Sequence, residues 1–473
     1  MCVAISIWRC CQVLAGYQLF MIDNAQKKQV PFLPYKGIDQ RSFLQRRKLA
    51  VKAALVGAFS GMVAVAFRMG LKQAEALRQF LLINYTGQAV FVPAFVFVVM
   101  LCFVVWLVKR CAPEASGSGI PHLKGILEDG SEFRALPVLA VKFFGGIIGI
   151  GSGLALGREG PTVQMGGAVG ALFARFFSVN PSETRLLICA GAGSGLSAAF
   201  NAPFAGLLFV LEELQHRLDR FSVVVAFSAT ISANIVCRLV FGATPIFILR
   251  QITRPELSLM LWCLLFGVFV GFAGLAFNLL LMRSLKIFAS RRYQLAAVLG
   301  LIFGAVGLYY PELLGMGHEL NEEIIASQVP FRLLVVFFLA RFAMTILSYN
   351  TGAPGGIFAP LLLLGMLAGA IFHHFVTWVQ PGQFDLGVFL VLGMGGMFSA
   401  IVRSPLTGII LILEMTSEFT LLLPLMTVAI LAYAVPEFAN NRPIYDALLD
   451  HDRQKKAEIE LQQEIPAEIR GLS

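Results

Sequence analysis

Charged residues are scarce in this sequence. Aspartate, glutamate, lysine and arginine make up 14% of its 473 residues and hydrophobic residues 57%, whereas roughly a quarter of the residues of a soluble domain are charged. The 6 histidines offer no pair on facing helices to hold a haem, because His373 and His374 are adjacent and the others lie in loop-like stretches. Among the 8 cysteines, the pair Cys10 and Cys11 lacks zinc ligands at a useful spacing. We therefore expect neither a soluble enzyme nor a bound metal or cofactor.

The chain contains many long apolar runs instead. Several approach or reach the roughly 20 residues with which a helix crosses a bilayer. They lie at 51–67, 89–108, 259–282, 295–309, 331–347 and 421–435. The net charge of +9 fits basic flanks such as Arg46, Arg47 and Lys48, and basic residues before the first run place the N-terminus in the cytoplasm. The sequence predicts an all-α polytopic membrane protein in contact with lipids and not with nucleic acid, with both termini cytoplasmic.

The stretch at residues 157–161 (GREGP) interrupts the apolar pattern about a third of the way along. An ionisable residue inside a membrane is expensive, so Glu159 is a candidate functional residue. Gly157 and Gly160 leave backbone N–H groups open to close approach, and Pro161 suits the first turn of a helix. Such a helix points its positive end at Glu159 or at an anion that displaces it. The alternative is that Arg158 and Glu159 only neutralise each other at a helix end.

Glycine and proline breaks occur twice, in the same order. Residues 191–213 align with residues 393–415, and residues 142–170 with residues 341–369. The glycine-rich stretch at 191–195 follows no strand and lacks the lysine of a P-loop, so it predicts no nucleotide site. Repeats with interrupted segments in matching places indicate a transporter whose site lies between the halves. We expect a first membrane repeat at 46–250 and a second at 251–450, flanked by cytoplasmic segments at 1–45 and 451–473.

Four features in this order resemble a known family. They are residues 117–121 (GSGIP), 157–161 (GREGP), 352–360 (GAPGGIFAP) and Tyr445 near the last helix. Over residues 45–450 the chain resembles the CLC family of chloride channels and chloride/proton antiporters. The resemblance implies a CLC-like fold of two inverted homologous halves with many tilted and broken helices, and a homodimer with one anion pathway in each subunit. We do not expect the family's pair of nucleotide-binding CBS domains in this chain. In this respect the chain resembles prokaryotic members of the family, and the resemblance implies a location in the plasma membrane.

The resemblance also implies a role for individual residues. The hydroxyls of Ser118 and Tyr445, with the backbone N–H groups of Ile357 and Phe358, would hold the central chloride. Glu159 would be the external gate, competing with the anion for the same helix ends. Such donors suit the task, because an anion held by a tightly bound full charge would not leave. Alone, Ser118 is typical of a turn and Tyr445 of a membrane interface. The serine in the first motif resembles that of chloride-preferring members.

Glu212 and Glu213 end the helix that starts near Pro203. Because adjacent helical residues point about 100° apart, one can face the interior and the other the dimer interface or the cytoplasm. Two solvated acids are the alternative. By resemblance, Glu213 matches the internal proton acceptor of the antiporters, where channels lack an acid. We therefore expect proton-coupled chloride exchange, with a passive, voltage- or pH-gated chloride channel as the alternative.

The remaining charged residues of interest are cations. Lys142 and Arg341 occupy matching places in apolar runs, where they either attract anions to the pathway or serve structural pairing. Arg403 is expected to form a packing ion pair. His122 and Lys124 stand where some bacterial antiporters carry acids, so coupling or pH response is expected to differ if those acids serve the internal proton path. Otherwise His122 is a surface histidine on a cytoplasmic helix.

Overall fold

The computed structural model describes residues 43–85, 91–131, 133–216, 219–248 and 257–464. The chain divides into two compact units, residues 1–48 and residues 49–473, and the side chains discussed below belong to the second. The predicted N-terminal extension at 1–45 lies almost wholly outside the described residues, as does the end of the C-terminal tail from residue 465 onward.

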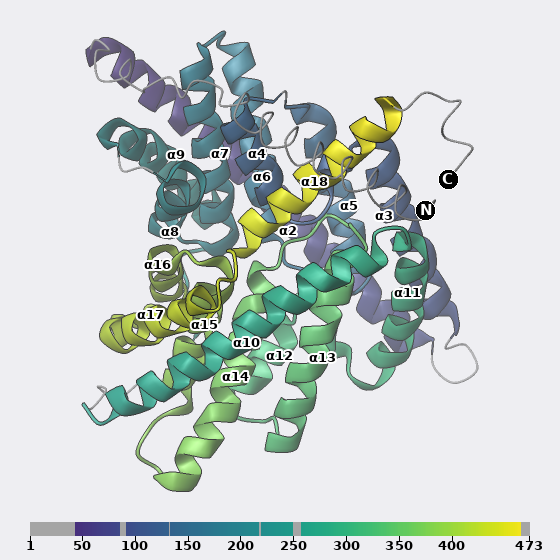
Figure 1. Cartoon of the computed structure of the whole chain (residues 1–473), viewed down its shortest axis with the longest axis vertical. Helices are drawn as coiled ribbons and strands as arrows, with labels where there is room; N and C mark the ends of the chain where they lie inside the picture. The colour runs from purple at the N-terminus through teal and green to yellow at the C-terminus, as the bar shows by residue number, and fades with distance from the viewer. Residues whose placement is uncertain (1–42, 86–90, 132, 217–218, 249–256, 465–473) are drawn as a thin grey trace, which may run out of the picture. The chain divides into compact units, whose positions relative to one another are not determined.

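Helices are the regular elements of the described residues, and they follow the same order twice (Figure 1). The first series is α2 (Phe43–Asn84), α3 (Phe91–Cys111), α4 (Ile120–Asp129), α5 (Ala135–Gly151), α6 (Glu159–Phe176), α7 (Pro181–Phe200), α8 (Pro203–Phe209) and α9 (Arg220–Phe241). The second is α10 (Leu259–Phe288), α11 (Arg292–Tyr309), α12 (His318–Ile325), α13 (Phe331–Asn350), α14 (Phe358–Val379), α15 (Leu386–Val402), α16 (Pro405–Thr416) and α17 (Leu422–Phe438). The last helix is α18 (Ile444–Glu464). Short and long helices alternate alike in the two series, as the sequence repeat predicts.

Many of these helices are suited to a bilayer. Within the described ranges, eight are long and apolar enough to cross a membrane, and shorter apolar helices occupy Ala135–Gly151, Leu386–Val402 and Pro405–Thr416. The chain is thus an all-α, multi-pass integral membrane protein, as its apolar runs predict. The shorter helices fit a fold in which several segments stop partway through the membrane.

Glycine sets the closest helix packing. A side-chain carbon on Gly166 of α6 would lie 2.1 Å from the carbonyl oxygen of Gly191 on α7, and one on Gly365 of α14 would lie 2.3 Å from that of Gly393 on α15. No side chain fits at these positions, so the helix backbones touch directly, as small residues permit inside membranes. The two contacts join residues that the repeat alignment matches, because Gly365 corresponds to Gly166 and Gly393 to Gly191.

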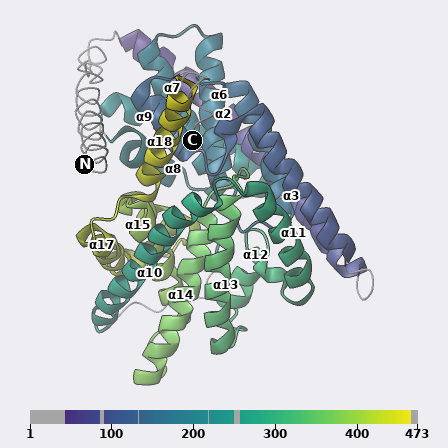
Figure 2. The same cartoon turned by 45° about the vertical axis from the view of Figure 1, so that its right-hand side comes forward.

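The final helix connects the two series. In Figure 1 α18 runs diagonally from the middle of the picture towards its upper right, and in Figure 2 it stands in the upper half with its lower end above α15. It packs against α4 of the first series and against α10 and α15 of the second. Tyr445, the second residue of α18, is thereby brought into the protein interior, where it is buried.

Candidate functional site

The three glycine-rich motifs meet through backbone hydrogen bonds. The N–H of Gly157 donates to the oxygen of Gly356 (2.7 Å), and the N–H of Gly356 donates back to Gly157 (2.8 Å). The N–H of Gly355 donates to the oxygen of Gly117 at 3.0 Å. Irregular backbone inside a membrane must be satisfied by other protein groups. Here each loop satisfies another, so three segments far apart in the sequence form one unit.

Gly160 allows the closest approach within this unit. A side-chain carbon there would lie 2.9 Å from the Cα atoms of both Ser118 and Gly356. Gly119 is needed for a different reason, because its φ of 81° lies in the left-handed region and places it as the residue before α4. The close approach of backbone that the sequence predicts at Gly160 is therefore present in the structure.

The motifs bring helix N-termini together. Ser118 lies just before α4, Glu159 begins α6, and Phe358 begins α14. The first N–H groups of a helix have no intrahelical acceptor, and the aligned peptide dipoles favour negative charge there. The N–H groups of Ile357 and Phe358 stand at such an end. The arrangement is therefore suited to an anion.

The Glu159 carboxylate occupies one of these helix ends. Its Oε2 accepts a hydrogen bond from the N–H of Ala359 in the first turn of α14 (3.3 Å), and only 2% of the residue is exposed. Arg158 Nε lies 3.9 Å from Glu159 Oε1, while its terminal nitrogen donates to the oxygen of Ala199 at 3.1 Å. Arg158 is therefore shared between the carboxylate and a backbone oxygen, and the carboxylate itself reaches across to the other half.

Ser118 and Tyr445 are both fully buried. Ser118 Oγ accepts a hydrogen bond from the N–H of Ile120 at 3.2 Å, which leaves its hydroxyl proton unused by that bond. The hydroxyl of Tyr445 has no hydrogen-bond partner among the described residues, and its ring packs edge-on against Phe358, with centroids 5.7 Å apart. A buried hydroxyl without a partner is costly. An anion that accepts its proton would remove that cost.

Lys142 and Arg341 hold backbone loops in matching ways. Lys142 Nζ donates to the oxygens of Ala115 (3.0 Å) and Gly117 (2.7 Å), directly before α4. Arg341 donates to the oxygens of Leu313 and Gly315, both at 2.9 Å, directly before α12. Both cations are fully buried. This geometry supports the structural alternative for each, and Lys142 orients the loop that carries Ser118.

Glu213 lies in a buried charged cluster. The helix from Pro203 ends as α-helix at Phe209 and continues as a π-helical turn, Val210–Gln215, which holds Glu213. Its Oε1 accepts a hydrogen bond from Lys124 Nζ at 2.9 Å and its Oε2 from Ser404 Oγ at 2.5 Å. Lys124 also donates to Asp446. Sequence reasoning singled out Glu213 and Lys124 separately and missed Ser404 and Asp446; the position of Asp446 directly after Tyr445 was the available signal.

Glu212 is only partly buried, and its contacts differ from those of the buried Glu213. Its carboxylate accepts hydrogen bonds from the N–H groups of Leu406 (3.2 Å) and Thr407 (2.7 Å), in the first turn of α16. Its repeat counterpart Glu414 does the reverse and accepts from the N–H groups at the start of α8. The interpretation of two solvated acids is therefore wrong. Each acid caps the positive end of the matching helix in the other series.

Two smaller expectations have opposite outcomes. Arg403 forms an ion pair with Glu437 and donates to the oxygen of Asn441 at 2.7 Å, which confirms a packing role. His122 is not a surface histidine: it is half-buried, lies 3.0 Å from Gln164 through Nδ1, and packs edge-on against Phe133. The burial follows from the position of α4 under α18 and beside α6, which a sequence pattern does not reveal.

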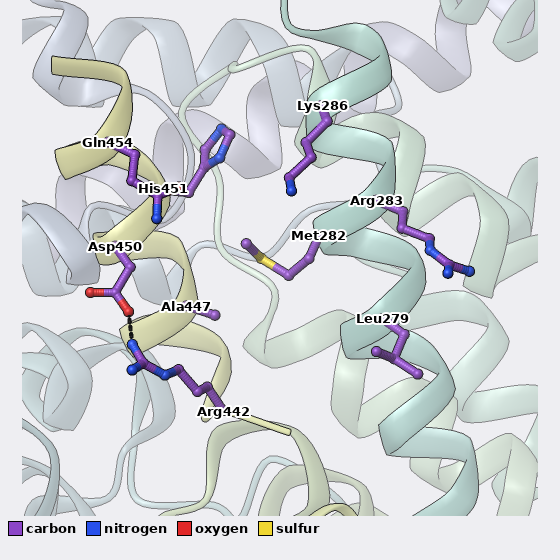
Figure 3. Close-up of a pocket in the computed structure, with 9 residues that line it drawn as sticks. All are labelled: Leu279, Met282, Arg283, Lys286, Arg442, Ala447, Asp450, His451 and Gln454. Carbon is purple, nitrogen blue, oxygen red and sulfur yellow. Dashed lines mark hydrogen bonds and ion pairs between the residues drawn. The ribbon is translucent and has the colours of Figure 1, made fainter. Parts of the chain in front are cut away.

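A surface pocket lies elsewhere, between α10 and α18 (Figure 3). Its volume is about 460 Å³, and its lining includes Met282, Lys286 and His451, which point into the gap, and the Arg442–Asp450 ion pair. None of the predicted site residues lines it. The candidate anion site is thus a packed set of donors inside the protein and not an open cleft.

Comparisons with known proteins agree on one group. The family model described as voltage gated chloride channel matches residues 100–437. The "H(+)/Cl(-) exchange transporter ClcA" of Vibrio parahaemolyticus is 38% identical over 430 residues, covering 88% of this chain and 92% of the relative. The protein of the same name from Citrobacter koseri is 37% identical, covering 86% and 90%. Among solved structures, a slow cyanobacterial Cl⁻/H⁺ antiporter superposes with a TM-score of 0.83 at 32% identity, covering 87% of this chain and 99% of that one. A eukaryotic CLC transporter, at 22% identity and a TM-score of 0.73, shows the shared fold.

Proposed function

This chain belongs to the voltage-gated chloride channel (CLC) family, and we propose that it is a secondary active transporter that exchanges chloride for protons. The relatives that cover most of its length are named H⁺/Cl⁻ exchange transporters, not enzymes. A cyanobacterial antiporter also shares its fold at 32% identity. Chloride and the proton are then the transported partners, and no cofactor takes part.

The observation that carries the proposal is the position of the Glu159 carboxylate. It accepts the N–H of Ala359 at the start of α14, where an anion would bind. Chloride and an ionised Glu159 therefore compete for one set of donors. Protonation removes the negative charge, frees these donors for chloride, and lets the side chain carry a proton as it leaves. One group thus controls both ions from the outer side.

On the inner side of Glu159, chloride and the proton need different protein groups. Chloride needs hydrogen-bond donors, which Ser118 and Tyr445 supply with the N–H groups of Ile357 and Phe358. A proton needs titratable groups, and Glu213 is a buried carboxylate that Lys124 links to Asp446 in the first turn of α18. We propose Glu213 as the internal proton acceptor. Chloride then passes Tyr445 without crossing the proton route.

A passive chloride channel is the second candidate. One observation favours it: Glu213 is already paired with Lys124 at 2.9 Å, and a fixed ion pair would keep its carboxylate ionised. A channel conducts chloride without proton exchange, so the two candidates differ in a measurable quantity.

The deciding experiment is the reversal potential of the purified protein in liposomes under crossed chloride and pH gradients. An exchanger reverses at a potential that depends on both gradients, and a pH jump then drives chloride movement. A channel reverses at the chloride Nernst potential whatever the pH gradient. A reversal potential that does not depend on the pH gradient would therefore show that the protein is a channel and not an exchanger.

We also propose the assembly and location that the family implies. The unit is a homodimer with one pathway in each subunit, held in the plasma membrane of a prokaryote with both termini in the cytoplasm. Crosslinking in native membranes tests the dimer, and labelling of cysteines introduced after residue 465 tests the sidedness.

A further inference from the structure

Glu213 is separated from the surface by a second charged residue. Lys124 lies between it and Asp446, and it donates hydrogen bonds to both carboxylates. We propose that Asp446 and Lys124 form a proton relay that loads Glu213 from the side of the membrane that α18 faces. This inference rests on the proposed exchange function and adds to it the route by which the proton enters.

The burial of the three side chains gives the relay a direction. Lys124 is 2% exposed and Glu213 4%, whereas Asp446 is 40% exposed. Each comes from a different element: Lys124 from α4, Glu213 from the π-helical turn after α8, and Asp446 from the first turn of α18. Within this cluster only Asp446 has substantial access to water. A proton that reaches Glu213 through the cluster must therefore enter at Asp446.

The net charge of the cluster allows it to take up one proton. Two carboxylates share a single ammonium group, so the ionised cluster carries one net negative charge. Ser404, directly before α16, adds a neutral hydroxyl that donates to the other oxygen of Glu213. Lys124 interacts electrostatically with the carboxylates of Glu213 and Asp446. Glu213 interacts in the same way with Lys124 and Asp446. A net negative charge in a poorly solvated place favours uptake of one proton.

The transfer needs no other reactant. Asp446 takes a proton from hydronium in the adjacent solution, which leaves water, and becomes a neutral acid. It then gives this proton to Lys124 Nζ as Lys124 gives one of its own three protons to Glu213. The N–H bond to the second proton breaks as the new N–H bond forms, so Lys124 remains an ammonium. Asp446 ends ionised and Glu213 ends neutral, one proton further in.

The relay also explains how chloride and proton stay apart on α18. Tyr445 and Asp446 are adjacent, so their side chains point about 100° apart on the helix. The Tyr445 ring packs against Phe358 beside the anion site, while Asp446 contacts Lys124. One helical turn therefore presents an anion donor on one side and a proton donor on the other.

The test compares variants that keep charge with variants that lose the exchangeable proton. In liposomes, chloride-driven proton uptake and chloride flux are measured for the wild type, Asp446→Asn, Asp446→Glu and Lys124→Arg. Arginine keeps the positive charge and both carboxylate contacts but does not give up its proton in proteins. We expect Asp446→Asn and Lys124→Arg to lower proton uptake about tenfold or more, as the loss of a proton-transfer group does, while chloride flux persists. Asp446→Glu should restore uptake.

The matched control is Asp450→Asn, one turn further along α18, where the acid pairs with Arg442 and not with Lys124. Its proton uptake should equal that of the wild type. Normal uptake in Lys124→Arg would overturn the relay, because Lys124 would then supply charge alone. Faster uptake in Lys124→Met would also overturn it, because Lys124 would then be a brake on Glu213.

Glu213→Gln, measured in parallel, separates this inference from the proposed function. If the wild type couples, Glu213→Gln does not, and the Asp446 and Lys124 variants couple normally, only the relay is wrong. If the wild type itself moves no protons, the exchange function is wrong.

Discussion

Replacing Glu213 with glutamine removes one titratable group and changes little else. The amide oxygen can still accept a hydrogen bond from Lys124 or Ser404, which now lie 2.9 and 2.5 Å from the two carboxylate oxygens. The amide cannot carry a proton. We expect chloride-driven proton uptake to disappear in this variant while chloride flux persists, because Ser118 and Tyr445 are untouched.

The size of the effect follows from the reversal potential. For a tenfold chloride gradient, a protein that moves chloride alone reverses at about 59 mV, the value for one elementary charge. An exchanger that moves n chloride ions per proton reverses, without a pH gradient, at n/(n+1) of that value, which is about 30 to 39 mV for n between 1 and 2. Glu213→Gln should therefore move the reversal potential upward to the full chloride value.

The variant also has a predictable effect on stability. Removing one partner of a buried ion pair commonly costs about 3–5 kcal/mol. Here Lys124 keeps Asp446 as a charged partner, so we expect a loss below that range, measured as a modest fall in melting temperature in detergent. A collapse of expression or of chloride flux would contradict this estimate.

Two results would refute the reasoning about coupling. Full coupling in Glu213→Gln, with loss of coupling in Glu212→Gln, would show that Glu212 and not Glu213 accepts the proton. A wild type that already reverses at the chloride Nernst potential would make the protein a channel. Either result is readable in the same liposome assay.

Three further predictions use the same preparation. Glu159→Gln should conduct chloride without moving protons. Wild-type chloride flux should rise as external pH falls, because a protonated Glu159 no longer competes with chloride for the hydrogen-bond donors. A flat pH profile, or a mutant that still pumps protons, would show that Glu159 is not the gate. Ser118→Pro should raise the ratio of nitrate to chloride transport, because proline removes a hydroxyl and a backbone N–H at once; an unchanged ratio would mean that Ser118 does not face the ion. Glu212→Ala and Glu414→Ala should each lower the free energy of unfolding by about 1 kcal/mol, the usual effect of losing a helix cap, and leave coupling intact. Lost coupling in Glu212→Ala would show that this acid takes part in transport. Unchanged melting temperatures would show that the two acids do not stabilise the helix ends.

The class of fold and the motifs of the site could both be predicted from local features of the chain. Apolar runs too long for a soluble core predicted membrane helices, and the described helices confirm them. The glycine and proline breaks marked the places where helices start, and their repetition predicted two series of helices in one order. Such features depend on local chemistry and on spacing along the chain, which the sequence states directly.

Which charged side chains contact each other became clear from the packing of the helices. Glu212 and Glu213 are neighbours in sequence, yet one caps α16 and the other binds Lys124, because a π-helical turn and the approach of α4 set their directions. Asp446 is drawn into the site by α18, which crosses back to α4 after more than three hundred residues of chain. Contacts of this kind depend on how helices pack in three dimensions, and no periodicity in a single sequence encodes the partner of a buried charge.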